Sequence, residues 1–237
     1  MDKNSNIYTF VFAIVMVTLI AGLLSYTATS LKPLQEKNVK AEKMQKILST
    51  IGVEVSREEA EASFATFIKG QLALKEDGTV DAASNAFELS LKKEVKKETV
   101  DQRFPLYVAE KGGKTFYVIP LYGAGLWDAI WGYIALDEDK NTIIGANFDH
   151  KAETPGLGAE ITTDWFQAQF QGKTLLNDLN AGYVADNFVS VKAIKGGAKV
   201  GDAHGVDAIS GGTITSDGVS DMVQERLARY LPYFKNN

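Results

Sequence analysis

The sequence predicts an α+β protein in which one N-terminal transmembrane helix precedes a single soluble domain, with a small antiparallel sheet flanked by helices. Three observations support this fold class. A long uncharged apolar stretch lies near the N-terminus, and two pairs of β-rich segments each surround a short turn. The chain then closes on an amphipathic helix that follows a glycine-rich loop. No internal repeat or low-complexity run divides the soluble part, so one domain is the simplest organisation.

The composition excludes several classes of function. Of 237 residues, 45% are hydrophobic and 23% are charged, which is enough for one core of ordinary size. The net charge of -5 and the lack of a long Lys/Arg tract argue against a nucleic-acid partner. The absence of cysteine excludes disulfides, iron–sulfur clusters, thiolate zinc sites and thiol nucleophiles. Without cysteine, any redox chemistry must come from a bound cofactor. His150 and His204 have no paired spacing, so we expect them to be ordinary residues and not metal ligands.

Residues 1–31 are predicted to form the membrane anchor. No charged residue occurs from Asn4 to Leu31, and the stretch Ile7–Ala28 is almost continuously apolar. About 20 such residues in a helix cross a bilayer core of about 30 Å. A signal peptide cleaved near Tyr26–Ala28 is the alternative, but the apolar region of a signal peptide spans only about 7–15 residues. We therefore expect a retained anchor in the lipid bilayer.

Charge alone does not fix the orientation of this anchor. Five lysines lie between Lys32 and Lys46, against the single Lys3 before the span. The positive-inside bias would place the following domain in the cytoplasm. That bias is weak for long translocated domains, and Glu36 and Glu42 lie among the lysines.

Residues 32–237 are predicted to form the soluble domain, beginning with juxtamembrane helices over 32–70. One apolar helical pattern ends at Gly52, a residue suited to the left-handed position after a helix. The members of this pattern are Leu34, Val39, Met44, Ile47, Leu48 and Ile51. Ser56 and Glu59 form a capping-box pattern for a second helix, which we expect to run toward Gly70.

Two β-hairpins are predicted in the middle of the chain. The turns are Lys111–Lys114, which contains two glycines, and Asp137–Asn141. The strand segments that flank them are Pro105–Val108, Thr115–Ile119, Ala129–Leu136 and Thr142–Phe148. Together these hairpins predict a small antiparallel sheet.

The remaining segments give weaker signals. Residues 75–103 are polar and rich in Lys and Glu, and we interpret them as a solvated excursion without a function. A short helix is expected around Trp165–Phe170, and weak strands near Val184 and over Val189–Val191. The final helix is marked by an apolar face that extends to Phe234.

The most unusual local sequence is Asp207–Gly218 (DAISGGTITSDG), immediately before the final helix. A glycine-rich loop that opens a helix can bind phosphate, because free backbone amides and the positive end of the helix dipole point at the anion. Gly211 and Gly212 let the backbone approach closely. A glycine turn with Thr215 or Ser216 as N-cap explains the same residues structurally. The hydroxyls within reach of a bound anion belong to Ser210, Thr213 and Thr215.

The stretch Asp207–Thr213 (DAISGGT) resembles the flavinylation motif of the FMN-binding domain family, usually written D-G-x-S/T-G-A-T. In that motif, a separate flavin transferase esterifies the last Thr to the phosphate of FMN. This chain departs from the motif at Ala208, which replaces Gly, and at Gly212, which replaces Ala. The resemblance implies a covalent phosphoester between FMN and Thr213.

Further segments extend the resemblance over nearly the whole chain. They are Leu34–Asn38, Pro120–Leu136 (PLYGAGLWDAIWGYIAL), Glu153–Glu160 (ETPGLGAE), Gly172–Lys173 and Lys195–Gly197. All of them are similar to the C subunit of the sodium-translocating NADH:quinone reductase. The ETPGLG segment is shared with the G subunit of the Rnf complex, whereas PLYGAGLW and the juxtamembrane helix favour the former.

The resemblance implies an electron-carrier subunit of a membrane respiratory complex that oxidises NADH, reduces ubiquinone and exports sodium. Such a subunit has no independent catalytic activity, and its partners are the other redox subunits and a flavin transferase. It implies a single-pass protein of the bacterial inner membrane with a periplasmic soluble domain. Two alternatives stay open: an Rnf-type electron-transport subunit, and a membrane-anchored scaffold that holds flavin or phosphate non-covalently.

The resemblance also implies a set of cofactor-binding residues. The flavin ring is expected between two walls, formed by Leu126 and Trp127 on one side and by Thr154, Gly156, Leu157 and Gly158 on the other. The phosphate is expected near Lys195, Ser210, Gly211, Gly212 and Thr215, where the helix N-terminus stabilises its remaining charge. Asp207 orients the loop or assists flavin transfer.

The residues themselves leave other roles open for three of these positions. Trp127 is also explained as a core aromatic residue, Lys195 as an unpaired surface lysine and Asp207 as an Asx-turn residue. A threonine hydroxyl without a His or Cys base nearby is a poor nucleophile. An external transferase is therefore expected to modify Thr213.

Overall fold

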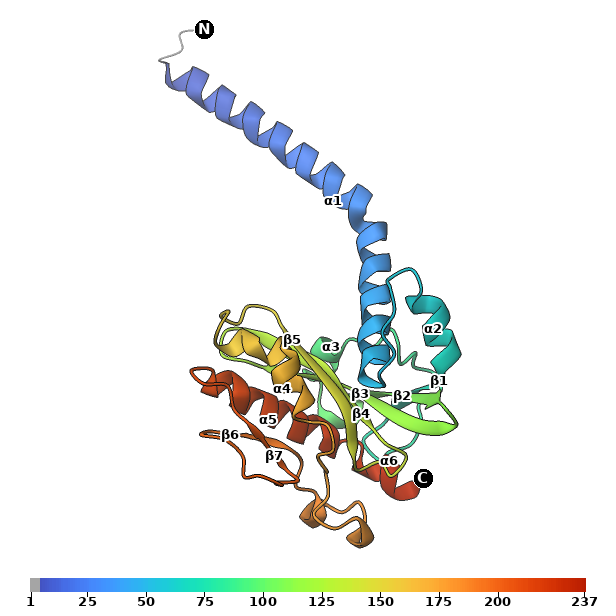
Figure 1. Cartoon of the computed structure of the whole chain (residues 1–237). Coiled ribbons are helices and arrows are strands. Elements are labelled where there is room, and N and C mark those ends of the chain that lie inside the picture. The colour runs from blue at the N-terminus through green and yellow to red at the C-terminus, as the bar shows by residue number, and fades with distance from the viewer. Residues whose placement is uncertain (1–4) are drawn as a thin grey trace. The chain divides into compact units, whose positions relative to one another are not determined.

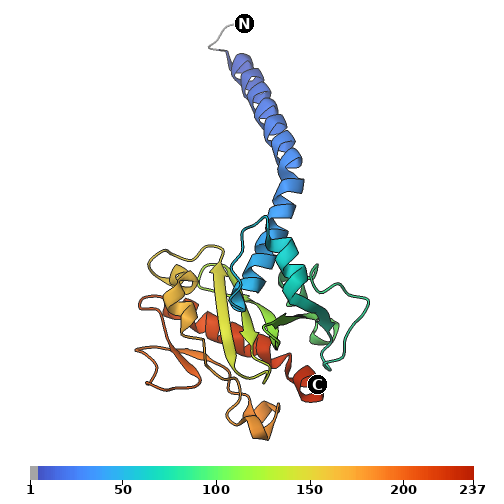
Figure 2. The same ribbon diagram turned by 45° about the vertical axis from the view of Figure 1, so that its right-hand side comes forward.

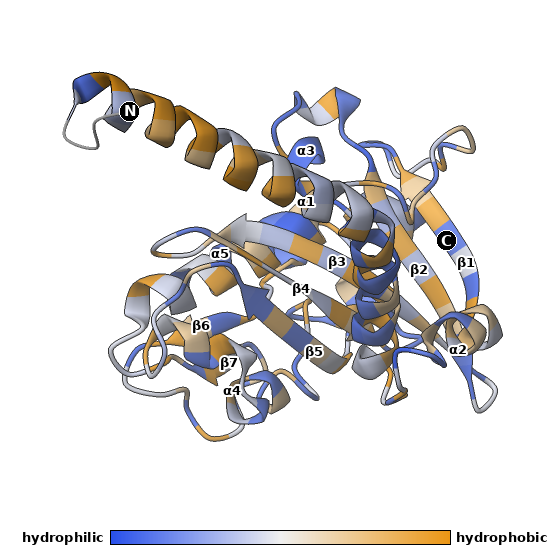
Figure 3. Ribbon diagram, turned by 90° about the horizontal axis from the view of Figure 1, so that it is seen from above, coloured by the Kyte–Doolittle hydropathy of each residue, from blue (hydrophilic) through white to orange (hydrophobic). Residues whose placement is uncertain are grey.

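In the computed structural model, which describes residues 5–237, the chain divides into two units, Met1–Lys43 and Met44–Asn237. The first unit is the greater part of helix α1 (Asn6–Thr50). By length and composition, α1 is able to cross a membrane, and the large apolar side chains of its first turns are exposed. Figure 3 shows apolar residues along this part of α1 and more polar ones along its later turns. The predicted span and the first juxtamembrane helix are thus one helix that continues through Pro33.

The last turns of α1 belong to the second unit. Ile47 and Leu48 are fully buried there. After the helix ends, Gly52 adopts a left-handed backbone with φ of 67°, and the amide of Val53 donates to the carbonyl oxygen of Leu48 at 3.1 Å. This geometry confirms the predicted glycine stop after the helix.

A five-stranded antiparallel sheet forms the centre of the second unit, with the strands in sequence order (Figure 1). Both predicted hairpins are confirmed, and Gly112 and Gly113 supply the positive φ values of the first turn. The strands are β1 (Ile68–Leu74), β2 (Phe104–Lys111), β3 (Lys114–Ala124), β4 (Ala129–Leu136) and β5 (Ile143–His150).

The second predicted helix is shorter than expected. Ser56 and Glu59 form the reciprocal bonds of the capping box, at 3.2 and 3.3 Å, and α2 (Ala60–Phe67) follows. Strand β1 then begins at once, so the expectation that the helix runs toward Gly70 is wrong. A Cβ at Gly70 would lie 3.2 Å from the Cβ of Val108, so the glycine allows β1 to approach β2 rather than ending a helix.

The two faces of the sheet have separate cores. Helices α5 (Thr213–Ala228), α4 (Asp164–Ala168) and α6 (Leu231–Asn236) contribute to one core, and α2 with the end of α1 contributes to the other (Figure 2). Side chains alternate between them along each strand, as Leu106 and Tyr107 do on β2. The core on the α5 side is the larger, and it fixes the helix that follows the glycine-rich loop.

The region 75–103 contains two short helices, α3 (Leu91–Glu94) and η1 (Thr99–Asp101). An ion pair at 2.6 Å between Arg103 Nε and Asp81 Oδ2 ties its end to its beginning. The ion pair closes the polar region on itself, and Phe87 packs the region against the core on the α2 side of the sheet.

The predicted weak strands near Val184 and over Val189–Val191 are wrong. The chain forms short 3-10 turns around Val184, with a bridge between Leu176 and Phe188. Residues 189–191 have no regular structure, because the amides of Val189 and Ser190 both donate to the carbonyl oxygen of Leu175 and Ser190 has φ of 65°. A parallel pair of three-residue strands follows instead. The remaining elements are η2 (Gly158–Thr162), η3 (Leu179–Ala181), η4 (Ala185–Asn187), β6 (Lys192–Ile194) and β7 (Gly205–Asp207).

The predicted short helix is confirmed as α4, whereas the predicted final helix is divided. Helix α5 ends at Ala228, and α6 starts at Leu231 with Pro232 in its first turn. Proline lacks the amide needed to continue a helix, which explains the break. Phe234 still joins the predicted apolar face in the core.

Candidate functional site

A cavity of about 230 Å³ lies where three distant segments meet. One segment follows β3, one follows β5, and the third is the glycine-rich loop with the first turn of α5. The cavity is lined by Leu126, Glu153, Thr154, Leu157, Gly158, Gly211, Gly212, Thr213, Ile214 and Thr215. The fold therefore brings together most of the residues expected around a flavin, which lie up to about 90 positions apart in the chain.

Other expected site residues lie outside the lining of this cavity. Trp127 and Gly156 neighbour lining residues in the chain, and Ser210 is exposed just before the glycines. Lys195 is exposed in the turn after β6. Asp207 ends β7, where its Oδ1 accepts from the amide of Ala198 at 2.7 Å. Asp207 thus bonds to the backbone of the connection between β6 and β7, nine residues before it in the chain.

Glycines allow the loop after β5 to contact the glycine-rich loop. Gly211 has φ of 75°, and a Cβ there would lie 2.6 Å from Leu157 Cδ2. A Cβ at Gly212 would lie 2.9 Å from Ile209 Cγ2 and 3.1 Å from the carbonyl carbon of Leu157. The alanine of the usual family motif would be crowded at Gly212, so this departure from the motif suits the close packing of the two loops.

The amides in the first turn of α5 have no side-chain cap from any residue that the structure describes (5–237). Gly212 is the N-cap residue and Thr213 the first helical residue. The alternative of an N-cap by Thr215 or Ser216 is wrong, because both hydroxyls bond elsewhere. Ser216 Oγ donates to the carbonyl oxygen of Gly212 and accepts from the amide of Ile209, each at 3.0 Å. Uncapped amides at a helix start suit an anion.

The three hydroxyls near this helix start differ in access. Ser210 is exposed and does not line the cavity, whereas Thr213 is half-buried in the cavity wall. Thr215 is only 1% exposed, and its Oγ1 donates to Glu153 Oε2 at 2.5 Å. Thr213 is therefore the hydroxyl that combines access with a place in the cavity.

Glu153 is a site residue that the sequence did not single out. It lines the cavity, is only 4% exposed, and accepts from the amide of Trp127 at 2.9 Å as well as from Thr215. Burial raises the pKa of Glu153. The hydrogen bonds from Thr215 and from the amides of Trp127 and Asp128, together with the nearby His150, outweigh burial and hold that pKa below its ordinary value of 4.5.

Trp127 is 67% exposed, so its interpretation as a core residue is wrong. Three lining residues, Leu126, Leu157 and Ile214, are also between 42% and 59% exposed. Large apolar side chains from all three segments thus form a rim around the cavity. Such a rim provides an apolar wall for a planar ring.

The two histidines make ordinary hydrogen bonds. His150 Nδ1 accepts from the amide of Glu153 at 3.1 Å, and His204 Nδ1 lies 2.8 Å from the carbonyl oxygen of Thr174. Within residues 5–237, no group of three His, Asp or Glu side chains has the arrangement of a metal site.

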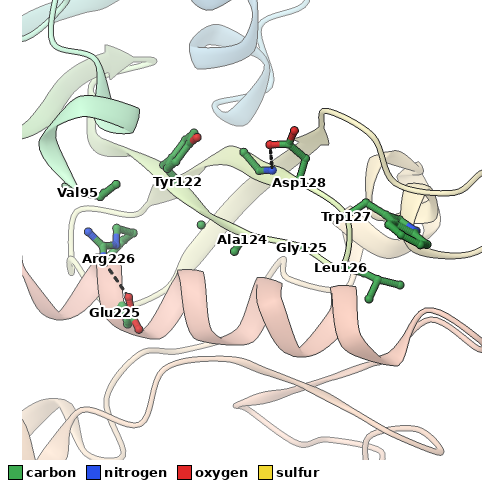
Figure 4. A pocket seen from close by; sticks show the side chains of 11 residues that line it. Val95, Tyr122, Ala124, Gly125, Leu126, Trp127, Asp128, Glu225 and Arg226 are labelled. Carbon is green, nitrogen blue, oxygen red and sulfur yellow. Dashed lines mark hydrogen bonds and ion pairs between the residues drawn. The ribbon is translucent and has the colours of Figure 1, made fainter.

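A second cavity, of about 510 Å³, shares Leu126 with the first. Figure 4 shows Tyr122 and Arg226 at one end of it, and Leu126 and Trp127 at the other. Leu126 lines both cavities, whereas Gly125, Trp127 and Asp128 line only the larger one.

Comparisons with known proteins agree with this geometry. Residues 125–228 match the FMN-binding domain family, and this range includes all three cavity segments. The chain is 31% identical to the C subunit of the Na(+)-translocating NADH-quinone reductase of Vibrio anguillarum, over 92% of this chain and 89% of that protein. It is 32% identical to the same subunit of Pasteurella multocida, over 93% and 89%.

A solved structure gives the same result. The crystal structure of the Na(+)-translocating NADH-quinone reductase C subunit from Parabacteroides distasonis is 39% identical, with a TM-score of 0.77, and the match covers 86% of this chain and 96% of that one. The chain belongs to the family of Na(+)-translocating NADH-quinone reductase C subunits. This confirms the expected family and fold class. Helix α1 makes the chain a membrane-anchored member of this family, and its soluble unit contains an FMN-binding domain.

The cavity fits the FMN of this domain type. The uncapped helix start suits a phosphate, and the apolar rim suits a ring.

Proposed function

We propose that this chain is an electron-carrier subunit of a sodium-exporting NADH:quinone reductase and that it carries FMN bonded through its phosphate to Thr213. Bound FMN supplies the capacity to accept and release electrons, while the protein supplies position and charge. The placement of Thr213 carries the proposal. It is the first residue of an uncapped helix and lies half-buried in the wall of an apolar-rimmed cavity.

Access distinguishes Thr213 from its neighbours as the attachment point. An external enzyme must reach the hydroxyl oxygen, and the attached group must then fall within the cavity. Thr215 fails the first condition, because it is buried and its hydrogen is donated to Glu153. Ser210 fails the second, because it is exposed and outside the cavity lining.

The cavity offers Thr213 no free base for self-modification. The carboxylate that lines the cavity, Glu153, already accepts hydrogen bonds on both oxygens. No histidine or cysteine occurs among the lining residues. Activation of a threonine oxygen requires a positioned base, so we include a flavin transferase among the partners of this chain.

The roles of the other residues follow from their positions. The first-turn amides of α5 would hold the phosphate, while Gly211 and Gly212 let the loop after β5 pack against this turn. Leu126, Leu157 and the neighbouring Trp127 would bound the ring and exclude water from one side. Thr154, Gly156, Gly158 and Thr215 complete the loop walls, while Lys195, Ser210 and Asp207 would act at the loop periphery.

The test compares three variants of the full chain expressed together with a flavin transferase. In a denaturing gel, covalent flavin fluoresces in the protein band, whereas flavin held non-covalently is lost. We expect no fluorescence for Thr213→Ala, retained fluorescence for Thr215→Val, and fluorescence at an intermediate level for Thr213→Ser, which keeps the hydroxyl. A fluorescent Thr213→Ala band would contradict the proposed attachment.

The proposal also places the soluble unit on the periplasmic side of the inner membrane, next to the other subunits of the complex. Because the chain has no cysteine, one introduced thiol reports its own location. Val200 is fully exposed and suits this purpose. With Val200→Cys, a membrane-impermeant maleimide should label intact spheroplasts, and labelling only after lysis would place the unit in the cytoplasm.

A further inference from the structure

The three segments that form the flavin cavity are joined by one side chain. Glu153, in the loop after β5, bonds through Oε1 to the amide of Trp127 at 2.9 Å and through Oε2 to Thr215 Oγ1 at 2.5 Å. Trp127 belongs to the segment after β3, and Thr215 to the first turn of α5. A single carboxylate therefore fixes the apolar wall and the helix start relative to each other.

The surrounding backbone leaves space for this carboxylate. A Cβ at Gly125 would lie 2.5 Å from Glu153 Oε1, and a Cβ at Gly158 would lie 2.5 Å from Oε2. Any larger residue at either position would displace the acid. The two glycines belong to different cavity segments, so both segments close around Glu153.

Burial makes these bonds consequential. An exposed carboxylate contributes little through one hydrogen bond, whereas a buried one that loses its partners leaves an uncompensated charge. Conversely, removal of Glu153 would leave the Trp127 amide and the Thr215 hydroxyl without this acceptor. The segment from Gly125 to Asp128 lines the larger cavity and leaves the Trp127 side chain exposed, so the bond from the Trp127 amide to Glu153 is one of the contacts that hold it in place.

We propose that Glu153 is the positioning residue of the flavin site: its carboxylate holds the Trp127 segment and the Thr213 turn around one cavity and places a negative charge in the cavity wall. This inference rests on the proposed attachment of FMN to Thr213. It assigns two separable effects to one residue. The hydrogen bonds shape the site for modification, and the charge makes the flavin harder to reduce.

Two variants separate these effects. Glu153→Ala removes both acceptors, whereas Glu153→Gln keeps the shape and one acceptor oxygen while removing the charge. Glu138→Gln is the matched control, because Glu138 is an exposed carboxylate in the turn at the other end of the β4–β5 hairpin. All three are made in the full chain and expressed with the flavin transferase.

Three readouts are measured on each variant. Intact-mass spectrometry gives the fraction of chain that carries FMN, spectroelectrochemistry gives the midpoint potential, and hydrogen exchange of the flavin-free chain reports on the Trp127 amide. Glu153→Ala should lower the modified fraction several-fold and speed exchange at Trp127. Glu153→Gln should restore much of the modified fraction but shift the potential to more positive values. Glu138→Gln should change none of the three.

The outcomes distinguish this inference from the proposal beneath it. If the wild-type chain carries no FMN, the proposed function itself is contradicted. FMN on the wild type, together with unchanged exchange in Glu153→Ala or an unchanged potential in Glu153→Gln, overturns only the role of Glu153. If Glu153→Ala does not fold, the potential of Glu153→Gln still tests the role of Glu153, because the glutamine side chain has nearly the shape of glutamate.

Discussion

The two ends of helix α5 differ in environment. Its later turns bury Val219, Met222, Val223 and Leu227 in the larger core, each no more than 2% exposed. Its first turn has no side-chain cap and leaves Ile214 59% exposed at a cavity rim. Within one helix, the packed end therefore fixes the position of the open end, whose amides and hydroxyl face the cavity.

This division has an energetic basis. Each large apolar side chain that becomes fully buried stabilises the fold by about 1.5–3 kcal/mol, so the packed end resists displacement. Substitutions at the two ends should therefore separate stability from flavin binding.

The largest stability effect is expected at the packed end. Leu227→Ala removes a side chain that is 1% exposed, and a buried Leu→Ala change costs about 2–5 kcal/mol. Denaturant unfolding of the full chain in detergent measures the loss. The folded fraction should still accept covalent flavin. A selective loss of flavin without loss of stability would show that the packed end of α5 acts directly on the flavin site.

A smaller effect on stability is expected in the middle of α5, between its open end and its packed end. A Cβ at Gly218 would clash with the carbonyl oxygen of Ala124, at the end of β3. Gly218→Ala gains about 1 kcal/mol of helix propensity, but overpacking costs about 1–3 kcal/mol. We expect a net destabilisation by the same unfolding measurement, together with a lower flavin content. A stabilised variant would show that α5 can move away from β3 at no cost.

The open end should also respond to pH through Glu153. Because the folded-state pKa of Glu153 lies below 4.5, its ionised form contributes stability that is present above that pH and lost as the pH falls through the folded value. Acid unfolding of the wild type should therefore include a component that Glu153→Gln lacks. Identical acid profiles for the two chains would show that this carboxylate adds no stability.

The smallest stability effect is expected at Trp127. Because its side chain is 67% exposed, Trp127→Ala should change the free energy of unfolding by no more than about 0.5 kcal/mol. The covalent flavin should remain, but its absorbance spectrum and potential should shift, since the ring loses an aromatic neighbour. An unchanged spectrum would remove Trp127 from the flavin environment.

Local patterns predicted much of the fold. Gly112 and Gly113 marked one hairpin, and Gly52 marked the end of α1. These signals are local, because glycine adopts positive φ without steric cost wherever it occurs. Strand β1 was missed, since Gly70 looks like a helix stop until its contact with Val108 on β2 is known. The three-residue strands β6 and β7 are too short for any periodicity to reveal.

The site was predictable only in part, for a related reason. The glycines and hydroxyls around Thr213 form a continuous motif that the sequence displays. Glu153 lies in a loop sixty-two positions before its partner Thr215, and an acidic residue before a Thr-Pro-Gly turn looks solvated until the fold buries it. The exposure of the Trp127 side chain could not be predicted either, because it depends on which segments pack around the loop after β3.

All of the expectations about flavin depend on a phosphoester bond between Thr213 and FMN. Peptide mapping by mass spectrometry of the native chain, purified from membranes, tests it most directly. We expect the peptide containing Thr213 to carry the mass of FMN minus water, with fragment ions that locate the addition on that residue. An unmodified Thr213 in a chain that carries flavin at Ser210, at Thr215 or elsewhere would contradict it.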